Sequence, residues 1–321
     1  MLAIACPGQG SQTPGFLSPW LELPGVREHL DRLSDLAETD LVAHGTVSDE
    51  DTIKDTAVAQ PLIVAAGLVV SRLVLGEQPL TASVVVAGHS VGEITASAIS
   101  QALTEEDALT FVRVRATAMA SAAAATPTGM SAVLGGEPAE VAAKLDELGL
   151  TAANANGGGQ VVAAGTLDQL QALAADPPAK ARVIALKVAG AFHTSHMSPA
   201  VTALEELRPS ITPLEPSATL LSNYDGAPVA SGSGNLDSLI AQVSRPVRWD
   251  LCMTSMQAMG VSGMIELCPA GTLTGLAKRG MRGTATLAVK SPEDLDAAHR
   301  FIEDHTRTAD IDPSLTPEGP Q

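Results

Sequence analysis

Aromatic residues are almost absent from this sequence. Phe, Trp and Tyr together make up 2% of its 321 residues, whereas hydrophobic residues as a whole make up 45%. A chain of this length can bury a large core, and that core must be built from Ala, Val, Leu and Ile. Proteins that bind single-stranded nucleic acid stack the bases on aromatic side chains, and this chain offers few of them.

Positive charge is also scarce. The chain has 19 Lys and Arg residues against 36 Asp and Glu residues, which gives a formal net charge of -17. A nucleic-acid-binding protein needs a basic surface to displace the counterions of the phosphate backbone, and an acidic surface repels phosphate. Nucleic acid is therefore not expected among the partners.

Cysteine is limited to three residues, Cys6, Cys252 and Cys268. An odd number at these spacings fits neither a disulfide framework nor a zinc site. The sequence therefore predicts reduced, buried cysteines that pack as small apolar side chains, and no metal site.

Long apolar runs are missing as well. The opening segment MLAIACPGQG has no basic residues and too short an apolar run for a signal peptide. The longest apolar segment, Pro61 to Val70, is stopped by Ser71 and Arg72 and is too short to span a bilayer. We therefore expect a soluble, cytoplasmic protein with no membrane partner.

What the sequence does contain is an alternation of apolar strands and helices. Four runs have the length and composition of buried strands: Leu2–Cys6, Ser83–Ala87, Ala218–Asn223 and Gly263–Pro269. Helical segments separate them, among them residues 60–75, which are apolar on all sides as in a buried helix. This alternation predicts a mostly parallel sheet.

The pattern changes between residues 121 and 188. There the predicted segments follow in the order strand, helix, strand, strand, helix, strand. This order is typical of the ferredoxin-like fold, so we expect a small domain inserted into the larger one. Residues 306–321 carry three prolines among Asp, Ser and Thr, and they are predicted to form a disordered tail.

Gly88-His89-Ser90-Val91-Gly92 has the G-x-S-x-G form of a nucleophile elbow. An apolar strand precedes it and an Ala-rich helix follows, so the turn is expected to expose the Ser90 hydroxyl and to aim the N–H of Val91 at an oxyanion. The alternative is a glycine-lined turn whose serine merely caps the helix. A serine hydroxyl is a poor nucleophile until a base removes its proton, so an elbow requires a histidine elsewhere in the chain.

Gly8 and Gly10 suggest at first a dinucleotide-binding loop after the first strand. Position 13, however, is Thr rather than Gly, and no G-x-x-x-x-G-K-S/T motif occurs. We do not expect nucleotide phosphate to bind at this loop.

Five separated stretches share the pattern of one known family. They are PGQGSQ at 7–12, GHSVGE at 88–93, RVRA around Arg115, GAFHTSHM at 190–197, and the end region with RPVRW and PAGTLTGLAKR. In this order and spacing the chain resembles the malonyl-CoA:acyl-carrier-protein transacylases of fatty-acid synthesis and the related acyltransferase domains of polyketide synthases. The likeness covers about residues 4–280, and it is strongest to stand-alone bacterial enzymes of the actinobacterial type.

The resemblance implies a catalytic pair. Ser90 becomes the nucleophile, and His193, in an AFHT element directly after the small domain, becomes its base, whereas His196 falls outside the matched element. Phe192 resembles the malonyl-type rather than the methylmalonyl-type element. No Asp or Glu stands out as a third member, and the family's pattern places the backbone carbonyl of Gln242 in that position, where it fixes the histidine tautomer.

The resemblance also implies the groups that bind the substrate. The backbone N–H of Gln9 is the second oxyanion donor opposite that of Val91. Arg115 lies in the acyl pocket, where its planar guanidinium can bind the malonyl carboxylate through two hydrogen bonds. Arg113, two positions away on the same helix, faces elsewhere and serves as an internal control.

The fold implied by the family is an α/β-hydrolase-like core, here residues 1–120 and 189–305, with the ferredoxin-like small domain at 121–188 and the active site between them. Asn154 and Asn156 match a family element on the small domain near this cleft, and Asn156 is predicted to contact the substrate.

The implied activity is transfer of a malonyl group from malonyl-CoA to the phosphopantetheine thiol of an acyl carrier protein. It proceeds with ping-pong kinetics through a malonyl ester on Ser90, and it uses no metal or redox cofactor. We expect a monomer.

Three other functions remain as alternatives. A serine esterase or thioesterase uses the same elbow but places its histidine late in the chain, where only His299 and His305 lie, in an acidic stretch with no predicted strand leading into it. A polyketide-pathway acyltransferase shares every motif. A non-catalytic module that binds carrier protein is disfavoured because Ser90, His193 and Arg115 are all present.

Carrier proteins of this pathway are acidic, so docking to an acidic enzyme is expected to depend on local cations. Two clusters are candidates: Lys278, Arg279 and Arg282, and Lys180, Arg182 and Lys187.

Overall fold

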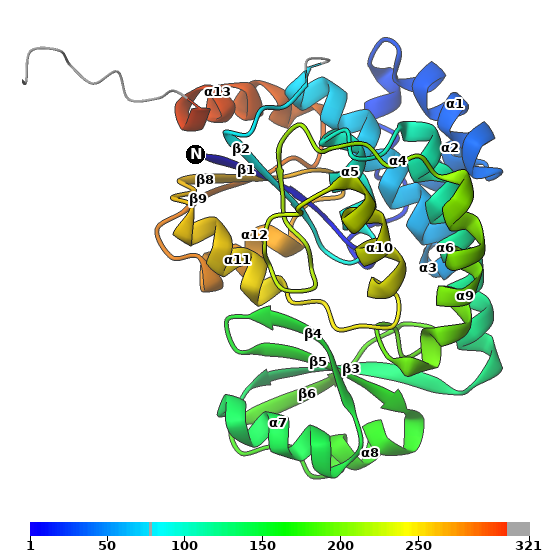
Figure 1. The fold of residues 1–321 in the computed structure, drawn as a ribbon, viewed down its shortest axis with the longest axis vertical. Coiled ribbons are helices and arrows are strands. Elements are labelled where there is room, and N and C mark those ends of the chain that lie inside the picture. The colour runs from blue at the N-terminus through cyan, green and yellow to red at the C-terminus, as the bar shows by residue number, and fades with distance from the viewer. Residues whose placement is uncertain (77–78, 307–321) are drawn as a thin grey trace, which may run out of the picture.

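The computed structural model describes residues 1–76 and 79–306 (Figure 1). A five-stranded parallel sheet forms the centre of the larger part, and a four-stranded antiparallel sheet forms a smaller part at one end of the molecule. The predicted fold class, a parallel-sheet α/β core with an additional small sheet, is confirmed. The predicted disordered tail lies outside the described residues except for Thr306.

The parallel sheet has the strand order β7-β2-β1-β8-β9, and every neighbouring pair is parallel. Its strands are β1 (Leu2–Cys6), β2 (Val84–Gly88), β7 (Thr219–Leu220), β8 (Gly263–Glu266) and β9 (Ala285–Ala288). β1 lies at the centre because it pairs with both β2 and β8. The loops that follow β1 and β2 therefore leave the sheet at the same edge.

Both faces of the parallel sheet are covered by helices, which explains why its strands are continuous apolar runs. Along β1, Leu2, Ile4 and Cys6 pack into the core cluster shared with α4 (Thr56–Leu75), α5 (Gly92–Ile99) and α6 (Glu105–Ala125). Ala3 and Ala5 point to the opposite face, into the cluster shared with α11 (Trp249–Ala258) and α12 (Thr272–Gly280).

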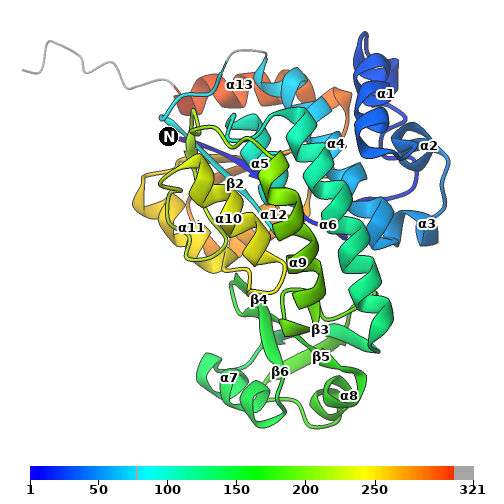
Figure 2. The same cartoon turned by 45° about the vertical axis from the view of Figure 1, so that its right-hand side comes forward.

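The remaining helices lie around this core (Figures 1 and 2). They are α1 (Val26–Ala37), α2 (Leu41–Thr46), α3 (Glu50–Lys54), α9 (Ser198–Leu207), α10 (Gly232–Gln242) and α13 (Leu295–Thr306). Among the described residues, α4 alone is long and apolar enough to cross a membrane by composition. Its apolar window is 78% buried within the fold. It is therefore the central helix of the core, as its apolar residues on all sides predicted.

The small sheet has the order β4-β5-β3-β6 with antiparallel neighbours, which is the ferredoxin-like arrangement predicted from the order of segments. Its elements are β3 (Thr128–Gly135), α7 (Pro138–Glu147), β4 (Thr151–Gly157), β5 (Gln160–Thr166), α8 (Leu167–Ala175) and β6 (Ala181–Ala185). Val133, Val141 and Leu173 belong to a separate apolar cluster between this sheet and its two helices. The expected boundary at residue 121 falls within α6, which continues to Ala125.

Backbone hydrogen bonds attach the small sheet to the core. The N–H of Ala155 on β4 donates to the carbonyl of Val247 at 2.9 Å, and the N–H of Val247 donates to the carbonyl of Ala153 at 2.8 Å. Arg279 of α12 also reaches β5, where its Nη2 donates to Oε1 of Gln160 at 3.1 Å. The segment between α10 and α11 thus forms one isolated parallel bridge to β4, between Val247 and Asn154.

Some sequence expectations were wrong in detail. The run Ala218–Asn223 forms only a two-residue strand. The acidic stretch near the end forms α13, and a strand, β9, does precede it in the chain. β9 was missed because it is a four-residue edge strand whose side chains are half-buried or exposed.

A charge cluster joins three helices on the outside of the core. Glu105, the first residue of α6, contacts His29 of α1 at 3.1 Å, Arg32 of α1 at 2.9 Å and Arg72 of α4 at 3.3 Å. Burial raises the pKa of Glu105, but the hydrogen bond and charge of His29 and the contacts with the two arginines outweigh it and lower that pKa to about 2. The ionised carboxylate therefore stabilises the folded state.

We predict that Glu105→Gln lowers the free energy of unfolding by ~1–2 kcal/mol at neutral pH, a value discounted because both arginines are half-exposed. The folded-state pKa lies below the ordinary value, so this stabilisation is complete above pH 4.5 and is lost as the pH falls towards 2. Denaturant unfolding of both proteins across this range checks it. A difference that stays constant down to the lowest pH contradicts the assignment.

Candidate active site

The site begins at the edge where β1 and β2 end together. Cys6 pairs with Gly88 as the last residues of the two strands. The N–H of His89 then donates to the carbonyl of Cys6 at 3.0 Å. The loop after β1 and the turn after β2 consequently lie against each other, and this brings the GQG and GHSVG motifs into one place.

Ser90 occupies a strained turn between β2 and α5. Its φ of 54° lies in the left-handed region, which is uncommon for a residue with a side chain. The flanking glycines are sterically required, because a Cβ on Gly88 would lie 2.0 Å from the carbonyl of Gly92, and one on Gly92 would lie 2.2 Å from the carbonyl of Cys6. This is the geometry of a nucleophile elbow rather than of a simple helix cap.

Asn223, just after β7, holds this turn from behind. Its Oδ1 accepts the N–H of Ser90 at 2.8 Å, and its Nδ2 donates to the carbonyl of Gly88 at 2.7 Å. The side chain is fully buried, so both hydrogen bonds are shielded from water. Sequence reasoning missed Asn223 because nothing in its local pattern indicates a distant turn as its partner.

The loop after β1 is anchored on α3. Nε2 of Gln9 donates to the carbonyl of Lys54 at 3.4 Å, and Nε2 of Gln12 donates to that of Ile53 at 2.9 Å. Within the described part of the chain, the backbone N–H groups of Gln9 and Val91 donate to no other group. Both residues line the cavity at Ser90, so their N–H groups remain free to bind an oxyanion there.

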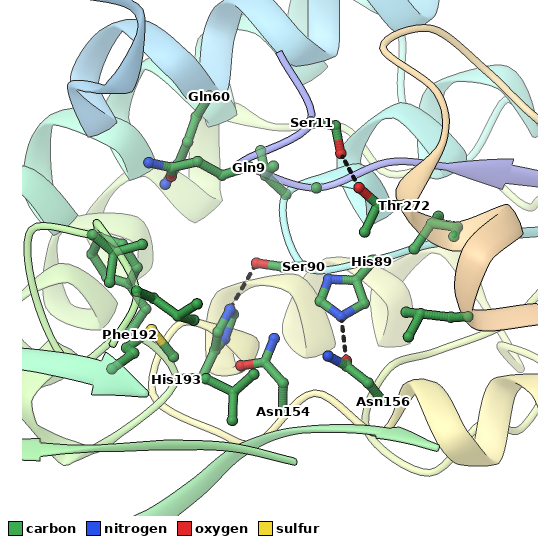
Figure 3. A pocket seen from close by; sticks show the side chains of 18 of the residues that line it. Gln9, Ser11, Gln60, His89, Ser90, Asn154, Asn156, Phe192, His193 and Thr272 are labelled. Carbon is green, nitrogen blue, oxygen red and sulfur yellow. Dashed lines mark hydrogen bonds between the residues drawn. The ribbon is translucent and has the colours of Figure 1, made fainter. Parts of the chain in front are cut away.

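His193 contacts the Ser90 hydroxyl directly. Its Nε2 lies 2.7 Å from Oγ of Ser90 (Figure 3). Its Nδ1 lies 2.8 Å from the backbone carbonyl of Gln242. A carbonyl can only accept, so Nδ1 carries the proton and Nε2 is left to accept from the serine. The predicted pair therefore comes together, with a carbonyl in the position that an acid holds in a triad.

His193 is neutral in this environment. Burial, followed by the nearby positive charge of Arg115, lowers the pKa of His193 to about 3, although the hydrogen bond to Gln242 opposes this shift. The backbone N–H of His193 donates to the carbonyl of Val243 at 3.1 Å, and the backbone φ of 61° again lies in the left-handed region. The imidazole is thus held in the form that can accept a proton.

Arg115 extends from α6 to the Ser90 hydroxyl, although it is not among the residues that line the cavity. The side chain is 1% exposed, and Nη2 lies 3.5 Å from Oγ of Ser90. Two amides fix the guanidinium: Nη1 donates to Oε1 of Gln60 at 2.6 Å and Nη2 to Oε1 of Gln242 at 2.8 Å. Burial lowers the pKa of Arg115 to about 10, so it remains a cation at neutral pH. Arg113 points away and pairs with Glu38 at 3.1 Å.

The sequence does not predict that the side-chain amides of Gln60 and Gln242 bind Arg115. Gln60 lies in the apolar helix α4, and for Gln242 the family pattern predicts a role of the backbone carbonyl alone. The side chain of Gln242 also donates to the carbonyl of Ser90 at 2.9 Å and to the carboxylate of Glu93. Glu93 ends the GHSVGE motif, and its place in that motif is the one feature of the sequence that indicates a role in the site.

A cavity of about 220 Å³ opens above Ser90 and lies between the two parts of the molecule (Figure 3). Phe192 and His193 line it from the core, and β4 contributes Asn154 and Asn156. Oδ1 of Asn156 is already bound to Nε2 of His89 at 2.9 Å. Oδ1 of Asn154, in contrast, is buried without a partner among the described residues, so its amide is the freer of the two. A direct contact of Asn156 with substrate remains a prediction.

The alternative histidines lie outside the site. Nε2 of His299 contacts the backbone carbonyl of Leu73 at 2.9 Å, and Nδ1 of His305 contacts Oγ of Ser262 at 2.9 Å. Neither lines the cavity, and His196 does not line it either. The late histidine that a typical esterase of this architecture uses therefore does not reach Ser90 in the described structure.

The three cysteines are free and buried, and in the part of the chain that the structure describes no group of His, Cys, Asp and Glu could hold a metal ion.

Comparison with known proteins agrees with this geometry. A family model described as the acyl transferase domain matches residues 4–312. Malonyl CoA-acyl carrier protein transacylase of Mycobacterium tuberculosis (strain H37Rv) is 51% identical over 297 residues, covering 92% of this chain and 98% of that protein. The Bacillus subtilis transacylase of the same name is 31% identical, with 96% and 99% covered. The crystal structure of MCAT from Mycobacterium tuberculosis superposes with a TM-score of 0.88 at 50% identity, covering 93% of this chain and 99% of that one. The chain therefore belongs to the acyl transferase domain family and, within it, to the malonyl CoA-acyl carrier protein transacylases.

Proposed function

We propose that this protein transfers a malonyl group from malonyl-CoA to the phosphopantetheine thiol of an acyl carrier protein, in fatty-acid synthesis. The single observation that carries the proposal is the contact of Ser90 with two functional groups. Oγ of Ser90 lies 2.7 Å from a neutral imidazole and 3.5 Å from a buried guanidinium. The first arrangement supports acyl transfer, and the second supports an acyl group that carries a negative charge.

In the first half-reaction, Nε2 of His193 accepts the proton of Ser90 as Oγ attacks the thioester carbonyl. The N–H groups of Gln9 and Val91 stabilise the resulting oxyanion, and each such donor is typically worth ~3 kcal/mol of barrier. The carbon–sulfur bond then breaks, and the coenzyme A sulfur takes the proton from His193. A malonyl ester on Ser90 remains.

In the second half-reaction, the pantetheine thiol gives its proton to His193 and attacks the ester carbonyl. The same two N–H groups stabilise the second oxyanion. The bond between the acyl carbon and Oγ breaks, and Ser90 takes the proton back from His193. This sequence needs no metal or redox cofactor, because each step moves only a proton and an acyl group.

Arg115 is proposed to select the acyl group. Malonyl differs from acetyl only by its carboxylate, and a buried carboxylate without a partner is unfavourable by several kcal/mol. A guanidinium has five N–H donors. Arg115 uses three of them, towards Gln60, Gln242 and Ser90, so two remain for a carboxylate. Acetyl leaves the cation unpaired.

We further propose that the protein acts as a monomer in the cytoplasm and binds neither nucleic acid nor membrane. The net charge of -17 supports this view of its partners.

The first prediction tests the covalent intermediate. Incubation with labelled malonyl-CoA and no acceptor should add one malonyl group to the peptide that contains Ser90, and Ser90→Ala should abolish the label while the fold is retained. Peptide mass analysis checks both proteins. Continuous hydrolysis without accumulation of label indicates an esterase instead, and absence of any label in the wild type indicates a binding module.

The second prediction concerns acyl selection. Arg115→Ala should lower kcat/KM for malonyl-CoA more than a hundredfold, a loss of ~3 kcal/mol or more of transition-state stabilisation, because the variant loses one partner of a buried charge pair. The loading of acetyl-CoA should be unchanged or should rise. Arg115→Lys should recover only part of the loss, since a single ammonium lacks the two-pronged geometry.

Arg113→Ala is the matched control for this measurement, because Arg113 lies on the same helix and contacts Glu38 instead of the site. The expected result is an unchanged ratio of the two specificity constants. If the Arg113 variant inverts the preference and the Arg115 variant does not, the wrong arginine has been assigned.

Each cation cluster contains a residue close in sequence to residues that line the cavity. Lys278 and Arg279 are exposed at the end of α12, shortly after Leu276, which lines the cavity. Lys187 is exposed between Leu186 and Val188, which also line it. An acidic carrier protein that delivers its thiol to Ser90 must approach this cavity, where these cations can attract it.

The third prediction for this reaction concerns docking. Replacing Lys278 and Arg282 together by Glu should raise KM for the carrier protein by about threefold or more at low salt, with little change in loading from malonyl-CoA. Arg279 is left intact because it binds Gln160. Arg300→Glu on α13 controls for a general loss of positive charge. Should the double variant and the control behave alike, the docking face lies elsewhere.

A further inference from the structure

Glu93 is a buried carboxylate behind the elbow to which the proposed reaction assigns no role. It lies in the first turn of α5, and the residue is 4% exposed. Its Oε1 accepts the backbone N–H of Asn223 at 2.6 Å, and its Oε2 accepts Nε2 of Gln242. Glu93 does not line the cavity, and both of its carboxylate oxygens are bound by other residues of the site.

Each of these two partners holds a different part of the site. Asn223 binds both sides of the elbow, at the N–H of Ser90 and the carbonyl of Gly88. Gln242 binds Arg115 with its Oε1 and orients His193 with its backbone carbonyl. The carboxylate of Glu93 thus connects the residue that holds Ser90 with the residue that holds His193 and Arg115.

We propose that Glu93, in its ionised form, is a positioning residue that fixes the orientation of the Gln242 carboxamide and thereby aims the Arg115 guanidinium at the acyl group. Discrimination between malonyl and acetyl consequently depends on Glu93. This inference rests on the proposed function.

The argument follows from which groups can donate. A carboxylate only accepts hydrogen bonds and a guanidinium only donates them. An amide between the two has one favourable orientation, with its NH₂ towards Glu93 and its oxygen towards Arg115, and this is the orientation observed. A glutamine at position 93 offers only one acceptor oxygen to the two donors that Glu93 binds, Asn223 and Gln242. The Gln242 NH₂ then faces another NH₂ group, and the displaced carboxamide no longer holds its oxygen against Arg115. Arg115 would keep only Gln60 as a fixed partner.

Electrostatics favour the same arrangement. Arg115 is a buried cation, and the carboxylate of Glu93 supplies an opposite charge nearby. Burial raises the pKa of Glu93 to about 7, while the hydrogen bonds from Asn223 and Gln242 and the charge of Arg115 counteract the increase. A small change in pH therefore changes its charge.

The other titratable groups around the elbow have pKa values away from the range just above neutral pH. Burial lowers the pKa of His89, which lines the cavity. Arg115 on α6 has a pKa of about 10, and His193 has a pKa of about 3. Cys252 on α11 stays a thiol, because burial and then the charge of Glu93 raise its pKa. Within this group, a transition near pH 7 is expected only from Glu93.

The experiment measures kcat/KM for malonyl-CoA and for acetyl-CoA, and compares their ratio in wild type and in Glu93→Gln. We expect the variant to lower the ratio by about tenfold or more at about pH 8, mainly through malonyl-CoA. In the wild type the ratio should fall as the pH is lowered from about 8 to about 6, and in the variant it should be flat. Titrations of the shared coenzyme A portion cancel in the ratio, and so does any loss of folded protein.

Glu105→Gln is the matched control, since it neutralises another partly buried carboxylate that lies away from the cavity. It should lower stability and leave the ratio and its pH dependence unchanged. An unchanged ratio in Glu93→Gln overturns the proposal. If that variant does not fold, a wild-type ratio that is independent of pH overturns it instead. Failure of the wild type to form a malonyl ester on Ser90 rejects the proposed function, whereas a labelled wild type with an unchanged ratio rejects this inference alone.

Discussion

The parallel pairing of β1 with β2 is the interaction on which the rest of the site depends. Cys6 is in register with Gly88, so the two strands end together and their loops leave the sheet side by side. The close approach requires glycine, because a Cβ on Gly92 would lie 2.2 Å from the carbonyl of Cys6. Since Ser90 sits between these glycines, displacement of the turn from β1 would also move its hydroxyl away from His193, which belongs to a distant segment.

Burial of charge is the second constraint. Arg115 and Glu93 both lie in the interior, where an unpaired charge is strongly unfavourable. Amides satisfy most of their hydrogen bonds: Gln60 and Gln242 accept from Arg115, and Gln242 also donates to Glu93. The same burial keeps His193 neutral, and a backbone carbonyl fixes its tautomer without adding a further charge.

The sequence predicted most of the architecture because local patterns determine it. Apolar runs identified β1, β2 and β8, and the order of segments between residues 121 and 188 identified the ferredoxin-like sheet. The misses have physical causes. β9 is a four-residue, half-exposed edge strand, and β7 is only two residues long. The run Ala218–Asn223 is mostly buried, and burial alone does not determine how much of it pairs as a strand.

For the site, the sequence by itself determined the elbow and, through the matched motifs, the choice of His193 and Arg115. Only the tertiary structure decided which polar side chains hold them in place. Gln60, Asn223 and Gln242 come from segments far apart in the chain, and a glutamine or asparagine has no local pattern that reveals its partner. The strand order β7-β2-β1 and the packing of α4, α6 and α10 bring these segments to one edge of the sheet. Their side chains come within hydrogen-bond distance of the site only in this folded arrangement.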